Sequence, residues 1–251
     1  MRSSTKFTAL GLAAGIAVIL SAAPASAVIL DLTTGGASGI IGSAYFVQVN
    51  DQSTGTGVID PFLRLQASGS EIGVNSDGPY TMDEKTGPFT HAIRVSEFGV
   101  TDLNGVQSVR FLLDINQTGA HPLLSLDQLK IYVAPTATYN TLSDLNTFAT
   151  QLYDMGVGNK VYLDYSLEHG SGSGDMLAYL PYSLLSPHQS KYLYLVSQFG
   201  ATGGEYATND GFEEWARVDG DPVAPIPEPA SLLLLGGGLI GAAMTRRRRS
   251  V

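Results

Sequence analysis

Short runs of alternating apolar and polar residues constrain the fold of this chain more than any other feature. In Arg110–Asn116, the side chains of Phe111, Leu113 and Ile115 share one face, and Leu112 lies on the other with the polar residues. A period of two is typical of a β-strand that buries one face. Similar runs occur at Tyr45–Val49, Val58–Gln66, Phe89–Val95, Leu129–Val133, Val161–Tyr165 and Lys191–Ser197.

One helix interrupts this pattern. It is predicted around Ser143–Tyr153, because apolar residues recur at spacings of three and four from Leu142 to Leu152 and Ser143 can cap the first turn. Many short strands with one helix, and no alternation of strands and helices, favour an antiparallel β-sandwich of jelly-roll type. The predicted fold is therefore mainly β, with one domain at residues 28–220.

The N-terminal 27 residues have the pattern of a secretory signal peptide. Arg2 and Lys6 precede an apolar run from Phe7 to Leu20, and Ala25 and Ala27 form a small-x-small cleavage site. The apolar run is short for a transmembrane helix, so cleavage by signal peptidase after Ala27 is favoured over a permanent anchor. Residues 1–27 are thus predicted to form a signal helix that is removed during export.

The C-terminus combines three features in a fixed order. A Pro-rich linker, residues 221–229, ends in Pro227, Glu228 and Pro229. An uncharged stretch interrupted by glycines, Ala230–Met244, follows. The chain then carries four consecutive basic residues, Arg246, Arg247, Arg248 and Arg249. An apolar run of this length is marginal for spanning about 30 Å of hydrocarbon, and cytoplasmic arginines would help to hold it in the bilayer. Residues 230–251 are predicted to be a hydrophobic helical tail.

This C-terminus resembles the PEP-CTERM sorting signal. The resemblance implies that an exosortase recognises Pro227, Glu228 and Pro229, that Ala230–Met244 stops in the inner membrane, and that the arginines retain it there. It further implies transient anchoring in the membrane, followed by placement at the cell surface or in the extracellular matrix. The family is associated with bacteria that make exopolysaccharide and biofilm matrix, so an exopolysaccharide is an implied partner.

Charge and cysteine content limit the functions open to the exported part. Without the basic residues of the two ends, eight basic residues remain against all 23 acidic ones, a net charge of −15 through Pro229. Such a surface repels nucleic acid, which excludes it as a partner. The chain has no cysteine, so its stability must come from core burial or from a bound metal rather than from disulfides.

Calcium is the one cofactor that the sequence indicates. Carboxylate and amide side chains occur on polar strand faces and in glycine-rich loops, where they can supply the oxygen ligands that calcium prefers. The candidate ligands are Asp114, Asn116, Asp127, Asp164, Asp175, Asp210 and Glu213. No segment has the fixed spacing of a calcium-binding loop, and acidic residues in loops also serve as turn formers and helix caps.

The twelve tyrosines raise the alternative of a glycan-binding surface. Tyr132 and Tyr162 lie on polar strand faces, and Tyr192 and Tyr194 share one face. Aromatic rings beside Asp or Asn can bind sugar rings, although tyrosine is also a common packing residue in strands.

No catalytic residue is predicted. The four histidines are scattered, and no nucleophile elbow, zinc motif or phosphate loop is present. The sequence therefore predicts an exported surface or matrix protein that is not an enzyme, with a structural, adhesive or polysaccharide-binding role. The alternative is a secreted carbohydrate-active enzyme of the glycoside hydrolase type, which would require two suitably spaced carboxylates.

Overall fold

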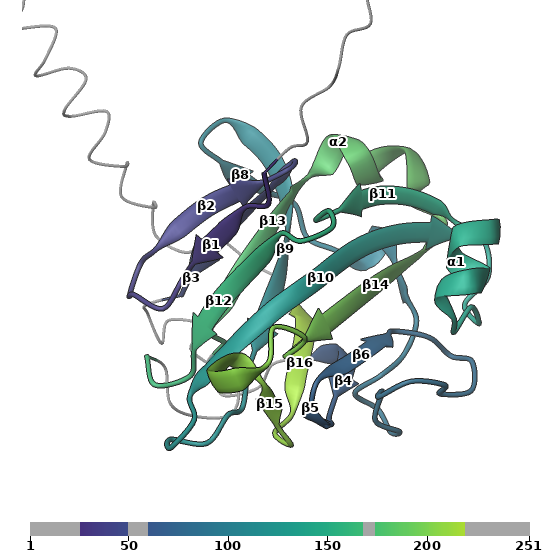
Figure 1. Ribbon diagram of the computed structural model, residues 1–251. Coiled ribbons are helices and arrows are strands. Elements are labelled where there is room, and N and C mark those ends of the chain that lie inside the picture. The colour runs from purple at the N-terminus through teal and green to yellow at the C-terminus, as the bar shows by residue number, and fades with distance from the viewer. Residues whose placement is uncertain (1–25, 50–59, 168–173, 219–251) are drawn as a thin grey trace, which may run out of the picture.

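The computed structural model describes residues 26–49, 60–167 and 174–218, which form two facing seven-stranded sheets (Figure 1). The first sheet has the order β1 (Ile29–Asp31), β12 (Lys160–Asp164), β10 (Leu123–Ala134), β14 (Tyr192–Phe199) and β6 (Glu71–Val74), with β11 (Thr150–Asp154) beside β10 and β7 (Ile93–Arg94) beside β14. The second has the order β2 (Ser38–Ile41), β3 (Ala44–Gln48), β13 (Met176–Pro181), β9 (Val106–Asp114), β16 (Glu213–Arg217) and β4 (Pro61–Leu65), with β8 (Thr101–Leu103) beside β9. A small additional sheet pairs β15 (Thr208–Asn209) with β5 (Ser68–Gly69).

These sheets confirm the prediction of a mainly β, sandwich-like fold. Strand pairs are antiparallel throughout the described residues except for β1 and β12, which run parallel with Leu30 opposite Val161. The predicted signal helix and the predicted hydrophobic C-terminal helix lie outside the described residues. Within the described ranges, no helix is both long and apolar enough to cross a bilayer.

The main hydrophobic core fills the space between the two sheets. Phe111 and Leu113 of β9, and Ile115 directly after it, are buried in this core, as their alternation predicted. Trp215 of β16 is fully buried there and donates from Nε1 to Ser197 Oγ of β14 at 3.0 Å. Burying each large apolar side chain stabilises the fold by about 1.5–3 kcal/mol, and the Trp215 hydrogen bond fixes one sheet against the other.

Each sheet also carries a smaller apolar cluster on its outer face. On the first sheet, α1 (Leu142–Phe148) lies beside β10 and β14 (Figure 1), and Leu145 packs against Tyr132 and Tyr194. On the second sheet, Leu112 of β9 belongs to a separate cluster opposite the main core. Leu112 therefore lies on the second face of its strand, which confirms its predicted placement.

The predicted helix is wrong in its extent and in its cap. Helix α1 ends at Phe148, and the cap is Thr141, whose Oγ1 accepts a hydrogen bond from Asp144 N at 3.0 Å. The residues of β11 leave the helical pattern because they pair with β10, where Tyr153 lies opposite Ile131. Cross-strand pairing and burial thus override the local periodicity.

More than one short helix is present, contrary to prediction. A second helix, α2 (Tyr182–Leu185), follows β13 and buries Leu185. The described residues also include the short 3-10 segments η2 (Val95–Glu97), η3 (Ser186–His188) and η4 (Gly204–Tyr206).

Candidate functional site

Two glutamates from opposite sheets meet in the interior of the sandwich. Glu71 is the first residue of β6, and its neighbour Ile72 packs in the outer cluster under α1, so Glu71 points the other way, towards the second sheet. Glu213 begins β16 two residues before the core residue Trp215, and the same alternation points it towards the first sheet. The exposed fractions of Glu71 and Glu213 are 1% and 0%.

The two carboxyl groups hydrogen-bond to each other and to three neighbouring groups. Glu71 Oε2 accepts a hydrogen bond from Ala67 N at 2.7 Å. Glu213 Oε1 accepts one from Gln117 Nε2 at 2.5 Å, and the Asn116 backbone also hydrogen-bonds to Glu213. The two carboxyl groups themselves are in hydrogen-bond contact. Two carboxylates from different sheets are therefore held together with few donors around them.

Burial raises the pKa of both carboxyl groups. For Glu71, removal from water is the largest cause, and the negative charge and hydrogen bond of Glu213 raise its pKa further. For Glu213, burial again raises the pKa, while hydrogen bonds from Glu71, Gln117 and the Asn116 backbone partly offset it. Two buried like charges in contact cannot both persist without compensation, so the pair retains a proton on Glu71 at neutral pH, which it shares with Glu213.

The seven residues predicted as calcium ligands are not brought to one place. In or beside the second sheet lie Asp114, Asn116, Asp175, Asp210 and Glu213, and in the first sheet lie Asp127 and Asp164. Across the described ranges, no three acidic or histidine side chains are grouped closely enough to hold a metal ion. The sequence named Glu213 but missed Glu71 and Gln117, because nothing in a single strand shows which residue faces it from the other sheet.

Several of these acids instead have local structural roles. Asp175 Oδ2 accepts from Ile115 N at 2.7 Å, which ties the start of β13 to the end of β9. Asp164 Oδ1 accepts from Ser166 N at 2.8 Å in a turn. Asp side chains in turns and at strand ends commonly accept hydrogen bonds from backbone amides in this way.

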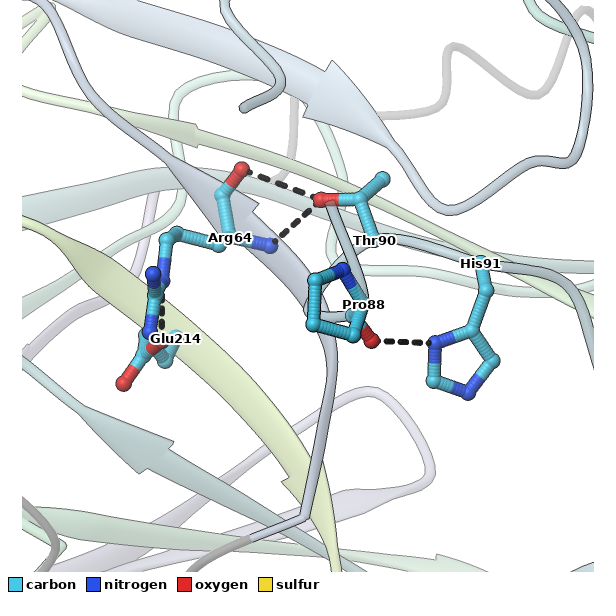
Figure 2. A network of polar contacts seen from close by, with 5 residues as sticks. All are labelled: Arg64, Pro88, Thr90, His91 and Glu214. Atoms are coloured by element: carbon cyan, nitrogen blue, oxygen red, sulfur yellow. Dashed lines mark hydrogen bonds and ion pairs between the residues drawn. The ribbon is translucent and has the colours of Figure 1, made fainter. Parts of the chain in front are cut away.

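A second buried acid, Glu214, belongs to a separate network on the opposite face of β16 (Figure 2). Arg64 of β4 forms an ion pair with Glu214, and its guanidinium carbon lies 3.4 Å from the centre of the Phe89 ring and 4.8 Å from that of Phe212. The ion pair and the two cation–π contacts occupy the charged group of Arg64. This cluster fixes β4 to β16.

Arg64 lies in β4, at the edge of the second sheet, and its backbone is hydrogen-bonded to Thr90 in the loop that precedes β7 (Figure 2). Arg64 N donates to Thr90 Oγ1 at 3.1 Å, and the same hydroxyl donates to Arg64 O at 3.4 Å. His91 Nδ1 lies 3.1 Å from Pro88 O, and since a carbonyl can only accept, Nδ1 carries the hydrogen. These contacts are structural and leave His91 without a metal-binding role through Nδ1.

Of the four tyrosines considered for glycan binding, one remains suitable in the structure: Tyr162, which stacks on Tyr206. Tyr132 and Tyr194 are buried beneath α1, with exposed fractions of 1% and 0%, so neither can belong to a glycan-binding surface. Tyr192 is covered by Arg94, whose guanidinium carbon lies 4.2 Å from the ring centre. Tyr162 is half-buried and stacks on Tyr206, with ring centres 4.0 Å apart and planes 18° apart.

Polar groups surround this stacked pair. Asp31 of β1 lies opposite Tyr162 in the strand register, and its negative charge contributes to raising the pKa of Tyr206, behind burial of the hydroxyl and the nearby Glu205. Lys160 precedes Tyr162 by two residues on the same face, and its Nζ lies 3.5 Å from Asp127 Oδ1. We call Asp31, Asp127, Lys160, Tyr162, Thr202 and Tyr206 the tyrosine patch.

The remaining functional residues are those of the two ends, which lie outside the described residues, apart from Ala27 at the start of the first range. Together, the sandwich, the export pattern at the N-terminus and the sorting pattern at the C-terminus define an exported, mainly β cargo protein. Residues 225–249 match the family model of the PEP-CTERM protein-sorting motif. The chain thus carries a PEP-CTERM sorting motif, which marks a protein that is exported, transiently anchored by its C-terminal tail and sorted by an exosortase to the surface or the extracellular space. Neither the curated proteins nor the solved structures compared with the chain give a match.

Proposed function

We propose that the β-sandwich is a structural or adhesive module of the cell surface or extracellular matrix that binds a neutral polysaccharide through the tyrosine patch. The observation that carries this proposal is the stacking of Tyr162 on Tyr206 on the outer face of the first sheet. The C–H faces of a sugar ring pack well on an aromatic face, and the polar tip of tyrosine stays in water.

The surroundings of the rings support this choice of ligand. Asp127 Oδ1 accepts from Thr202 Oγ1 at 2.7 Å, and Lys160 Nζ donates to the same hydroxyl at 2.7 Å. Carboxylate, hydroxyl and ammonium groups beside an aromatic ring can pair with sugar hydroxyls. The net charge of −15 on the exported part opposes binding of an acidic polysaccharide, so a neutral glycan is favoured.

We propose binding rather than hydrolysis. A glycoside hydrolase holds its two carboxyl groups about 5–9.5 Å apart on either side of the scissile bond. Glu71 and Glu213 are instead in contact and fully buried, which leaves no room for a sugar or for an attacking water between them. The adjacent acids Glu213 and Glu214 face opposite sides of their strand, so they do not form a pair either.

The test is a binding titration of the full chain, purified in mild detergent, with laminarin as a neutral glucan and alginate as an acidic one. We expect laminarin to bind and alginate not to bind. Tyr206→Ala should weaken laminarin binding about tenfold, equivalent to about 1.4 kcal/mol. Phe148→Ala is the matched control, because Phe148 is an aromatic residue with an exposed fraction of 62% that lies on α1, away from the patch. Equal binding by Tyr206→Ala and the wild type would refute the proposed surface.

A further inference from the structure

Strand β2 differs from the other outer strands of the two large sheets, that is, from those with a neighbour on one side only. An outer strand offers unpaired backbone groups to other chains, and proteins usually protect it with charge, proline, a bulge or a covering segment. In the described residues, each of the others contains an acidic or basic residue: Asp31 in β1, Arg64 in β4, Glu71 in β6, Arg94 in β7, Asp102 in β8 and Asp154 in β11. Strand β2 has the sequence Ser-Gly-Ile-Ile and pairs with β3 in a regular register, so it has none of these protections within the strand.

The edges formed by β4 and β6 are also covered by another segment of the chain. Asp83 N donates to Ile72 O of β6 at 3.0 Å, and Asp83 O accepts from Gln66 N, directly after β4, at 3.2 Å. Lys85 N donates to Arg64 O of β4 at 2.9 Å. One segment thus satisfies outward backbone groups of both edge strands at that end of the sandwich.

The ladder between β2 and β3 shows which backbone groups of β2 point outward. Gln48 N donates to Ala37 O at 2.8 Å, and this pair continues the register of the ladder. Hydrogen-bonded and non-bonded pairs alternate in an antiparallel ladder, so the N–H and C=O groups of Ser38 and Ile40 point away from β3. In the part of the chain that the structure describes, no hydrogen bond reaches these outward groups. They lie along the margin of the second sheet, at the purple end of the chain in Figure 1.

The surroundings of this edge are apolar and uncharged. Ile41 is buried in the main core, so Ile40 points to the outside by alternation, and its exposed fraction is 65%. Tyr45 of β3 lies opposite Ile40. The sequence has no charged residue between Asp31 and Asp51, although the exported part has a net charge of −15. Another acidic molecule can therefore approach this edge without placing like charges side by side.

We propose that β2 pairs in antiparallel orientation with β2 of a second copy of this chain, about a two-fold axis at Gly39. Ser38 of one copy then faces Ile40 of the other, and both such pairs exchange backbone hydrogen bonds in each direction. This register is self-complementary, as a two-fold interface requires. Gly39 has no side chain to obstruct the axis, where the two backbones come closest.

A second copy fits this edge better than a lipid surface does. Lipid could cover the Ile40 side chain, but it cannot pair with a row of backbone amides and carbonyls. In the pair, the second sheets of two copies join into one continuous sheet. This pairing does not depend on the proposed binding of a polysaccharide, and it would stand if that binding failed.

The first experiment is sedimentation equilibrium of the full chain in density-matched mild detergent over a range of protein concentrations. We expect the wild type to form a dimer. Ile40→Lys should raise the dissociation constant about tenfold or more, because it places a charge on each side of the pairing. Val106→Lys is the matched control, since Val106 has an exposed fraction of 51% but lies on β9, inside the strand order of the same sheet. This variant should dimerise like the wild type.

Two further substitutions separate backbone pairing from apolar contact. Ile40→Pro removes the outward N–H and leaves every hydrogen bond between β2 and β3 in place, as proline does on edge strands. It should therefore be monomeric with the circular dichroism of the wild type. Ile40→Val keeps the N–H and should still dimerise.

Cross-linking tests the register directly. The natural chain has no cysteine, so one introduced cysteine is the only thiol of a variant. A mixture of Ser38→Cys and Ile40→Cys chains should be joined efficiently by a short bismaleimide reagent, whereas Val106→Cys chains should stay single. Three results would overturn the pairing: a wild type that stays monomeric at every concentration, a dimer that survives in both Ile40→Lys and Ile40→Pro, or equal cross-linking of Val106→Cys.

Discussion

Gly211 sits where the chain enters β16 and passes close to the segment after β9. A Cβ added at Gly211 would lie 1.5 Å from Asn116 O, a backbone atom that cannot turn away. We expect Gly211→Ala to destabilise the fold by about 3 kcal/mol, at the upper end of the cost of overpacking, because one of the two segments must shift. The free energy of unfolding in urea measures this effect.

Gly119 provides the control for this substitution. It lies a few residues along the same segment, yet a Cβ there would meet nothing within 4 Å. Gly119→Ala should change the free energy of unfolding by less than about 1 kcal/mol, in the direction of stabilisation. If Gly211→Ala is as stable as Gly119→Ala, the close approach of the two segments is wrong.

The candidate site shows the limit of single-residue inference. Alternation correctly assigned Leu112 and Leu113 to opposite faces of β9, since that property depends only on neighbours in the chain. The meeting of Glu71 with Glu213 depends on how two sheets stack, and no local pattern encodes it. The acids that the sequence favoured were selected by loop composition, and residues such as Asp175 instead bind backbone amides.

The start of helix α1 depends on the side chain of Thr141. Thr141 Oγ1 accepts from the Asp144 amide and also lies 2.8 Å from Asp144 Oδ2, to which it donates. Thr141→Ala should destabilise the fold by about 1 kcal/mol, the usual cost of losing an N-cap. Ser143, the cap predicted from sequence, already lies inside the helix, so Ser143→Ala should be nearly neutral. Chemical denaturation of both variants checks the difference, and a larger loss in Ser143→Ala would place the cap at Ser143 instead.

At the scale of elements, strands were easier to predict than the helix. Long alternating runs such as the one in β9 can be recognised as strands from the sequence alone, because a strand that buries one face has an apolar residue at every second position. The helical spacing of apolar residues continues through Leu152. Residues Thr150–Asp154 nevertheless form β11, because they pair with β10. The parallel pairing of β1 with β12 has no local signal at all, because it joins the start of the domain to a distant strand.

The start of the sandwich is tied to a distant loop through the backbone of Val28, the residue that follows the predicted cleavage site. Val28 N donates to Asn159 Oδ1 at 2.7 Å, and Val28 O accepts from Lys160 N at 2.9 Å. Cleavage after Ala27 would make Val28 the first residue, and its new ammonium group could still donate to Asn159. The domain therefore begins within a residue or two of the predicted cleavage site.

The sorting motif determines the location of the folded domain, and substitution of its acidic residue tests directly whether an exosortase recognises it. Within the matched segment, Glu228 is flanked by Pro227 and Pro229, and its side chain is the one acidic group of the Pro-Glu-Pro motif. We expect Glu228→Ala to block processing by the exosortase. The variant should then remain in the membrane fraction with its tail attached, whereas the wild-type protein should be released with a smaller mass.

Intact-mass measurement of the membrane and released fractions in the native host distinguishes these states. Glu205→Ala makes the same chemical change at an exposed position of the sandwich, so its processing should match that of the wild type. Altered mass and location in Glu228→Ala alone would assign recognition to the motif rather than to the folded domain. Unchanged mass and location in Glu228→Ala would show that the carboxylate is not read, and recognition would then have to rest on the prolines and the hydrophobic tail.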